Sequence, residues 1–129
     1  MKVQGIAWMG VQTSRFAEMA ALIRALTGSP PPVEEEGFNL WSLPNGDLIE
    51  LFAQGKKPGF GAGPVVGFRV TDLAASRRDV ESAGAEVVGG YGPNESGYEA
   101  VHFRAPDGNV YELVHDPEHE ARAVSPGSS

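Results

Sequence analysis

The sequence predicts an α+β domain made of two copies of one βαβββ module, and three observations point to it. The segments LPNGDLIELF at 43–52 and APDGNVYELV at 105–114 share a proline, a glycine, a glutamate and a leucine at a constant offset of 62 residues. GVQTS at 10–14 parallels FRVTD at 68–72 at an offset of 58 residues. Both GVQTS and FRVTD are followed by a helical pattern that ends at a glycine. Three matches in one order indicate an internal repeat more strongly than a single shared turn motif does.

The first copy begins with an apolar, β-rich run at 6–13, which predicts a strand. Ser14 is a suitable helix N-cap, and the apolar residues after it recur at helical spacing as far as the next glycine. A Pro-Asn-Gly turn then separates two strand patterns, which predicts a hairpin of 38–43 and 47–52. A short strand at 33–36 is expected before the hairpin, in a segment rich in proline and charge.

The second copy repeats this order. A strand is expected at 65–71, and Asp72 is the N-cap of a helix that ends at Gly84. A short strand follows at 86–88. The last two strands, at 99–104 and 109–115, flank a Pro-Asp-Gly turn and form the second hairpin.

These elements define one domain over 1–116. Module one covers 1–53, a glycine-rich linker covers 54–64, and module two covers 65–116. The linker is too short to separate two independent domains, and each half has too little core to fold alone. Residues 117–129 lose periodicity, so we expect a polar C-terminal tail whose end is disordered. His115 and His119 are four residues apart, but the polar surroundings favour a solvated terminus over a zinc site there.

Composition excludes several classes of function. Ten basic residues against seventeen acidic ones give a net charge of −7, which repels a nucleic-acid backbone. There is no cysteine for a disulfide, a thiolate metal site or a nucleophile, and this suits a reducing cytoplasm. No apolar run is long enough to cross a membrane, and the start lacks the pattern of a secretory signal. We therefore expect a cytoplasmic protein with neither a nucleic-acid partner nor a membrane partner.

The second half, GFRVTDLAASRRDVESAGAEV followed by HFRAPDGNVYELV, resembles the vicinal oxygen chelate superfamily. That group contains glyoxalase I, extradiol dioxygenases, fosfomycin-resistance enzymes and bleomycin-resistance proteins. The resemblance covers about residues 4–115 and is less specific in the first half. It implies that the two βαβββ modules form a cupped mixed sheet around a cavity that binds small molecules. It implies no single reaction, because fold and function separate widely in this group.

The resemblance also implies where a metal would bind, with one ligand on the first strand and one on the last strand of each module. Counted back from Ser14 and Asp72, the first-strand positions are Ala7 and Val65, which cannot bind metal. The last-strand positions are Glu50 and Glu112. These two could hold a hard divalent ion weakly, but Zn²⁺, Fe²⁺ or Ni²⁺ sites normally recruit imidazole as well. We expect no metal and no other cofactor, with a divalent metal ion on Glu50 and Glu112 as the alternative.

The alternation of strand residues selects candidates for the cavity wall. We expect Met9 on the same face as Ala7, and Arg69 on the same face as Val65. Arg69 either presents a cation to the cavity or pairs with an acid at the end of its strand. His102 faces the cavity by the same alternation, whereas Trp41 and Phe103 pack beneath the helices. Trp8, Tyr98 and the glycine-rich segment 89–100, which could cover the cavity mouth, complete the candidates.

Three of these residues carry charge or protons. Glu50 and Glu112 are either site residues, as metal ligands or as an acid and base pair, or structural groups paired with a cation or the backbone. In fosfomycin-resistance relatives, the place that matches His102 holds a side chain that contacts the ligand. His102 is therefore a ligand contact, a proton carrier or a core residue. We take Glu112 and His102 as the candidate catalytic pair.

We carry three functional hypotheses. The first is a metal-free small-molecule binding protein of the glyoxalase/bleomycin-resistance type, which sequesters a drug or a metabolite. Its ligand would be cationic or polar and aromatic, because the protein is acidic. The second is a divergent metal-dependent lyase, isomerase or dioxygenase that uses Glu50 and Glu112. The third is a non-catalytic interaction module whose cavity is filled by side chains. We also expect a homodimer, and the sequence leaves open whether the modules pair within one chain or between two.

Overall fold

The computed structural model describes residues 2–61 and 63–123. Module one contributes β1 (Gly5–Thr13), α1 (Phe16–Thr27), β2 (Val33–Glu35), β3 (Phe38–Ser42) and β4 (Leu48–Ala53). Module two contributes β5 (Val65–Arg69), α2 (Leu73–Ser82), β6 (Glu86–Tyr91), β7 (Glu99–Arg104) and β8 (Val110–His115), and α3 (His119–Arg122) follows it. The two βαβββ modules predicted from the repeat are therefore confirmed.

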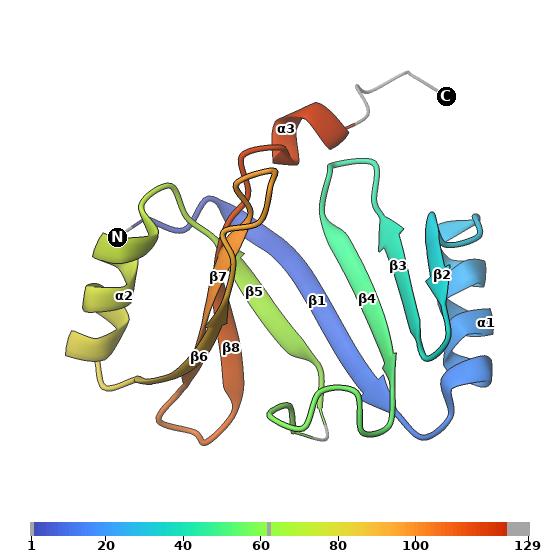
Figure 1. Cartoon of the computed structure of the whole chain (residues 1–129), viewed down its shortest axis with the longest axis horizontal. Helices are drawn as coiled ribbons and strands as arrows, with labels where there is room; N and C mark the ends of the chain where they lie inside the picture. The colour runs from blue at the N-terminus through green and yellow to red at the C-terminus, as the bar shows by residue number, and fades with distance from the viewer. Residues whose placement is uncertain (1, 62, 124–129) are drawn as a thin grey trace.

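Within these residues one eight-stranded mixed sheet runs in the order β2-β3-β4-β1-β5-β8-β7-β6. The order inside each module is the same, and the modules join where β1 pairs antiparallel with β5. In each module the first strand pairs parallel with the last, as β1 with β4 and β5 with β8. The modules thus pair within one chain, and the sheet curls into a cup between α1 and α2 (Figure 1).

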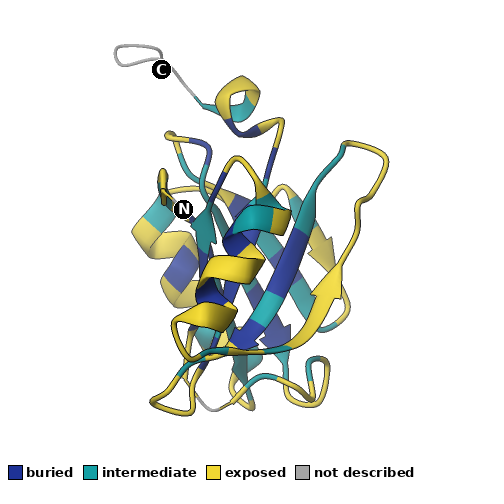
Figure 2. Cartoon of the chain, turned by 90° about the vertical axis from the view of Figure 1, so that its left-hand side faces the viewer, coloured by how far each residue is buried: buried dark blue, intermediate teal, exposed yellow. Residues whose placement is uncertain are grey.

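Two clusters of side chains hold the helices on the outside of the cup. Ile23 of α1 packs on Trp41 and Leu51, which are fully buried. Val80 of α2 belongs to a second cluster with Phe103 and Leu113. Trp41 and Phe103 thus lie beneath the helices, as the alternation of their strands predicts. Figure 2 shows that the opposite face of α2 is exposed to solvent.

The N-terminal ends of the two long helices were both predicted from the sequence, and one of these predictions is wrong. Asp72 is the N-cap of α2 and accepts a hydrogen bond of 2.9 Å from the backbone N–H of Ala75. The prediction of Ser14 as the N-cap of α1 is wrong, because α1 begins one residue later, after Arg15, without a side-chain cap. The equivalent positions on β1 and β5 therefore shift by one residue relative to our count. None of the helices among the described residues is both long and apolar enough to cross a membrane.

The C-terminal segment also differs from the prediction. Residues 116–123, which we call the C-terminal strap, contain α3 and lie across the open end of the cup (Figure 1). His119 in the strap is only 6 % exposed, so this part of the expected polar tail is packed against the domain. The end of the tail that we expect to be disordered, 124–129, lies outside the described residues.

Candidate ligand-binding cavity

A cavity of about 580 Å³ lies on the concave face of the sheet and is lined by both modules, the linker and the strap. Its larger apolar side chains are Trp8, Phe38, Leu40, Leu48, Phe52 and Phe60. Its polar side chains are Glu50, Lys57, Tyr91, Asn94, Ser96, Tyr98, His102, Glu112, Asp116 and Arg122. The volume lies within the usual range for small-molecule sites, and the mixture of apolar walls with a few polar groups is typical of them.

Trp8 and Glu50 meet at the wall formed by β1 and β4. The indole Nε1 of Trp8 donates a hydrogen bond of 2.6 Å to Oε1 of Glu50. The indole lies back over Gly10, where a Cβ atom would be only 2.3 Å from the ring. Glycine at position 10 therefore leaves the space that Trp8 needs to reach Glu50.

This environment changes the acidity of Glu50. Burial raises the pKa of its carboxyl group from 4.5 to about 7, because the charged form loses water. The hydrogen bond from Trp8 opposes the rise in pKa, the charge of Glu112 adds to it, and Lys57 opposes it. Glu50 is therefore divided between its neutral and charged forms near neutral pH, and it can both donate and accept a proton.

Glu112 occupies the equivalent position in module two and is paired with His102. Glu112 is 5 % exposed, and its Oε2 lies 3.2 Å from Nε2 of His102, the residue opposite it on β7. On the other side, Glu112 lies opposite Gly67 of β5. A nearly buried carboxylate without a donor would be costly, so His102 stabilises Glu112 at the cavity wall.

The loop between β6 and β7 forms one side of the cavity mouth. Asn94 organises it, because its Oδ1 accepts hydrogen bonds from the backbone N–H groups of Ser96 and Tyr98 and from the Ser96 hydroxyl. Tyr91 and Tyr98 are in edge contact, with ring centroids 6.1 Å apart. Burial, followed by the charges of Glu112 and Glu50, raises the pKa of the Tyr98 hydroxyl. Tyr98 therefore remains a hydrogen-bond donor at physiological pH.

The linker supplies a wall that the sequence analysis did not assign to the site. The ring of Phe60 contacts Trp8 and Phe52 of module one and His102 of module two, at centroid distances of 6.0, 6.1 and 5.9 Å. Lys57 also lines the cavity. Phe60 stands alone among glycines and proline in the sequence, so no periodicity indicated its position.

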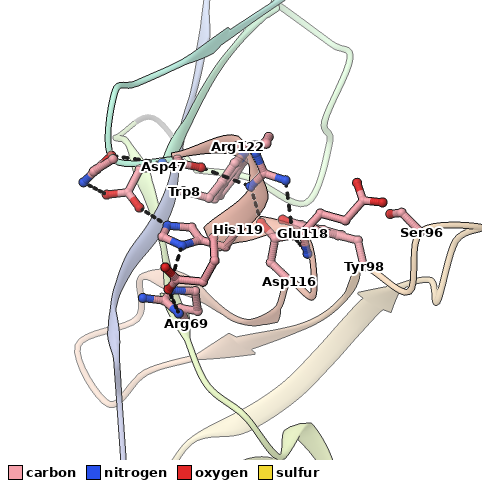
Figure 3. A network of polar contacts seen from close by, with 12 residues as sticks. Trp8, Asp47, Arg69, Ser96, Tyr98, Asp116, Glu118, His119 and Arg122 are labelled. Atoms are coloured by element: carbon pink, nitrogen blue, oxygen red, sulfur yellow. Dashed lines mark hydrogen bonds and ion pairs between the residues drawn. The ribbon is translucent and has the colours of Figure 1, made fainter. Parts of the chain in front are cut away.

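The strap lies at the end of the cup opposite the linker (Figure 1), and Figure 3 shows the polar contacts that hold it there. Nε2 of His119 lies 2.8 Å from Oδ1 of Asp47, in the turn between β3 and β4. Arg122 donates to the carbonyl of Gly46 at 3.0 Å and pairs with Asp116 at the end of β8. These contacts tie the last residues of module two to the first hairpin. Asp116 and Arg122 thereby become cavity residues, although we expected Arg122 in a solvated tail.

The structure brings together five of the seven predicted site residues at one cavity: Trp8, Glu50, Tyr98, His102 and Glu112. Met9 does not line the cavity, whereas its neighbour Trp8 does, and the pairing of β1 with β5 is irregular between Ile6 and Trp8. Trp8 lies opposite Gly67, which itself lies opposite Glu112.

Arg69 also lies outside the cavity. It is at the end of β5, where its guanidinium is 3.1 Å from the Gln4 side chain and 3.7 Å from Glu120 of the strap. Of the two alternatives for Arg69, the structure shows pairing with an acid. Arg122 is the arginine that lines the cavity, and Arg69 is not.

The residues at the cavity do not fit a three-ligand metal centre. With α1 beginning after Arg15, the first-strand positions are Trp8 and Val65, and the indole N–H is a hydrogen-bond donor only. That N–H already occupies an oxygen of Glu50. Across residues 2–61 and 63–123, no three His, Asp or Glu side chains gather to hold a metal ion.

The fold and the cavity define a two-module α+β protein with the fold of the vicinal oxygen chelate superfamily. No protein-family model and no curated protein matches the sequence. A solved structure of Mn(II)-bound glyoxalase from Novosphingobium aromaticivorans is similar, with a TM-score of 0.70 and 19 % identity. The match covers 89 % of this chain and 40 % of that one.

Two methylmalonyl-CoA epimerases have the same fold over nearly their whole length. The enzyme from Mycobacterium tuberculosis matches with a TM-score of 0.64 and 21 % identity, over 94 % of this chain and 93 % of that one. A Streptomyces coelicolor variant in complex with 2-nitronate-propionyl-CoA matches with a TM-score of 0.61 and 19 % identity, over 97 % and 100 %. At these identities the comparisons establish the fold, and the reaction has to be argued from the site.

Proposed function

We propose that this chain is a metal-free small-molecule binding protein, which sequesters a flat, largely apolar ligand that carries a hydrogen-bond donor or a cationic group. One observation carries the proposal: a cavity with aromatic walls presents the carboxyl groups of Glu50 and Glu112, and Trp8 fills the place beside Glu50 where a metal ligand is expected. Among the described residues, the hydrogen bond to Glu50 is made at Oε1, so Oε2 can accept a donor from a ligand.

The energetics of such a cavity favour modest affinity. A two-ring ligand that buries about 250 Å² of apolar surface gains roughly 6 kcal/mol, before the cost of lost motion is subtracted. A hydrogen bond to a buried carboxylate adds about 1 to 2 kcal/mol. We therefore expect dissociation constants in the micromolar range for simple aromatic probes.

The first experiment is elemental analysis and Mn²⁺ titration of protein purified without a metal-affinity tag. We expect less than stoichiometric metal and no saturable calorimetric response to Mn²⁺. A tightly held ion that is lost in Glu50→Gln or Glu112→Gln would overturn the metal-free proposal.

Binding itself is tested with a matched pair of probes, 2-naphthol and 2-methoxynaphthalene. The chain has two tryptophans, so Trp41→Phe leaves Trp8 as a fluorescent reporter inside the cavity. We expect quenching by both probes, with 2-naphthol about fivefold to tenfold tighter because it donates a hydrogen bond. If neither probe binds at millimolar concentration, the proposal fails.

A second function is favoured by the acid–base groups. Glu50, with a pKa of about 7, and the His102–Glu112 pair face one cavity, which suits proton transfer to and from a carbon acid. Of the enzyme alternatives, this supports a divergent lyase or isomerase with Glu112 and His102 as catalytic residues, whereas a dioxygenase would need a redox centre as well. The similar fold of methylmalonyl-CoA epimerases makes methylmalonyl-CoA the first substrate to try.

The test for this alternative is exchange of solvent deuterium into methylmalonyl-CoA, followed by mass spectrometry. If the chain is such an enzyme, the parent protein should catalyse this deuterium exchange and the Glu112→Gln variant should not. Absence of exchange, together with binding of 2-naphthol, would leave the binding protein as the function.

The hypothesis of a non-catalytic interaction module receives no support. It requires a cavity that is filled by side chains, whereas the cavity here has a volume of about 580 Å³. The homodimer stays a prediction, and light scattering at micromolar concentration tests it by the mass of the particle. The cytoplasmic location also stays a prediction, and fractionation of the source cells tests it.

A further inference from the structure

The linker is fixed to the domain by one side chain of β1. The backbone N–H of Lys57 donates to the Gln12 Oε1 atom at 2.7 Å, and Gln12 Nε2 donates back to the Lys57 carbonyl at 3.1 Å. The same carbonyl accepts the backbone N–H of Phe60 at 2.9 Å. Gln12 thus fixes the turn that contains Lys57 and Phe60 at the cavity wall. Its side-chain amide pairs with the backbone of Lys57 through two hydrogen bonds, as the backbone of a neighbouring strand would.

This turn places the ammonium group of Lys57 at the cavity. The Lys57 ammonium lies 5.1 Å from the centre of the Phe52 ring and 5.9 Å from the centre of the Phe60 ring. Lys57 is half-buried, so part of its hydration is replaced by aromatic faces. Among the residues that the structure describes, no carboxylate lies within 4.0 Å of its ammonium group, although its charge acts on Glu50 from farther away.

The other basic side chains of the cavity already have partners. Arg122 is held by Asp116 and by the carbonyl of Gly46, and His102 is held by Glu112. In the described part of the cavity, Lys57 is therefore the cation whose charge is available to a ligand.

The spacing along β4 indicates the size of that ligand. Glu50 and Phe52 point to the same side of β4, and alternate residues of a strand are about 7 Å apart. The Lys57 ammonium lies over the ring of Phe52, two residues along β4 from Glu50. An aromatic ring system between the two positions would place an anion at one end and a donor at the other.

We propose that Lys57 binds a carboxylate on the ligand, and that Gln12 is the residue that positions Lys57 to do so. The ligand class is then an aromatic acid with a hydroxyl or amino group at the end opposite its carboxylate. A single ammonium without a second cation fits one negative charge better than a phosphate. The inference rests on the proposed function, because it names the ligand class of the same cavity.

The experiment compares 6-hydroxy-2-naphthoate with 6-hydroxy-2-naphthamide by calorimetry on the full chain. The two probes share shape and donor and differ in the charge at one end. We expect the carboxylate to bind about tenfold tighter than the amide, as one partly buried ion pair allows. Lys57→Met should remove this difference in affinity between the two probes, whereas Lys57→Arg should retain most of it.

Lys56→Met is the matched control. Lys56 is the exposed neighbour of Lys57 and lies beside Gly37 outside the cavity, so its loss changes the net charge equally. We expect the tenfold preference to persist in this variant. A preference that falls equally in Lys56→Met and Lys57→Met would reflect net charge alone and would overturn the role of Lys57.

Gln12→Leu tests the positioning role. Loss of the two hydrogen bonds should lower affinity for the carboxylate while leaving affinity for the amide within about twofold, because the amide does not use Lys57. Equal losses for both probes would show that Gln12 supports only the cavity as a whole. Equal binding of both probes by the parent protein would refute the ligand class and leave the binding function intact, whereas failure of both to bind would remove the proposed function as well.

Discussion

The indole of Trp8 and the carboxyl group of Glu50 join β1 to β4 through a hydrogen bond of 2.6 Å at the cavity wall. We predict a coupling energy of about 1 to 2 kcal/mol in a double-mutant cycle of Trp8→Phe and Glu50→Met, measured by urea unfolding at pH 7. Trp41 supplies the control, because it is buried beneath α1 and donates to the carbonyl of Ser29 instead. The cycle of Trp41→Phe with Glu50→Met should be additive within about 0.5 kcal/mol. Additivity in both cycles would mean that the Trp8–Glu50 bond contributes nothing to stability.

The raised pKa of Glu50 makes the free energy of unfolding depend on pH. Below pH 4.5 the carboxyl is protonated in both states, whereas between 4.5 and about 7 the folded state keeps a proton that the unfolded state releases. Stability should therefore fall as pH rises from about 5 to 8, with a contribution from Glu50 on the order of 2 kcal/mol.

Glu50→Gln removes this titration, so its unfolding free energy should change less over the same range and exceed that of the parent protein at pH 8. Glu95→Gln, at an exposed residue of the β6–β7 loop, is the control and should follow the parent curve. A steep fall that persists in Glu50→Gln would assign the pH dependence to another group.

His119 is predicted to stabilise the strap. Its side chain is 8 % exposed and contacts Asp47 at 2.8 Å, so His119→Ala should cost about 2 kcal/mol in unfolding free energy. His115 is the matched histidine, with a side chain that is 36 % exposed and 4.0 Å from Glu99. His115→Ala should cost less than about 0.5 kcal/mol, measured by the same denaturant titration. Similar costs for the two variants would contradict a packed strap.

Gly46 and Gly108 are equivalent in the repeat and differ in one contact. Both have a positive φ, of 90° and 88°, which an L side chain adopts only with strain. A Cβ at Gly46 would lie 2.5 Å from the carbonyl oxygen of His119, whereas a Cβ at Gly108 would meet nothing within 4 Å.

Gly108→Ala should therefore cost about 1 to 2 kcal/mol from strain alone, and Gly46→Ala about 1 to 3 kcal/mol more. The excess should vanish in a chain that ends at Pro117, because the strap is then absent. An excess that remains after truncation would have to arise inside the hairpin itself.

Much of the fold could be predicted from the sequence because its signals are local. The strands alternate, the helices have a period near 3.6, and both hairpins surround a turn with glycine, so each pattern can be seen within about ten residues. The structure confirms the βαβββ order and the equivalent positions of Glu50 and Glu112 on β4 and β8. The strand at 86–88 is longer than predicted, because β6 continues through Gly89 and Gly90, which favour no regular structure.

The rest of the site depends on contacts between distant residues. A helix as short as α3 shows no periodicity, and its partner Asp47 lies far away in the sequence. The single-residue shift at the start of α1 was invisible because Ser14 is a better N-cap than Arg15 by composition. Of the two candidates predicted on β1, Trp8 lines the cavity and Met9 does not. The sequence therefore indicated the carboxyl groups, but not the linker and strap that enclose them.

The cavity has a consequence for how such a chain could acquire a new ligand. The linker lies at one end of the cup and the strap at the other, and neither belongs to the duplicated βαβββ unit (Figure 1). Lys57, Phe60 and Arg122 therefore set charge and shape at the two ends of the cavity, while the strand pairing that forms the sheet lies elsewhere. Replacement of the linker and the strap is therefore a way to change which ligand the cavity selects without changing the sheet.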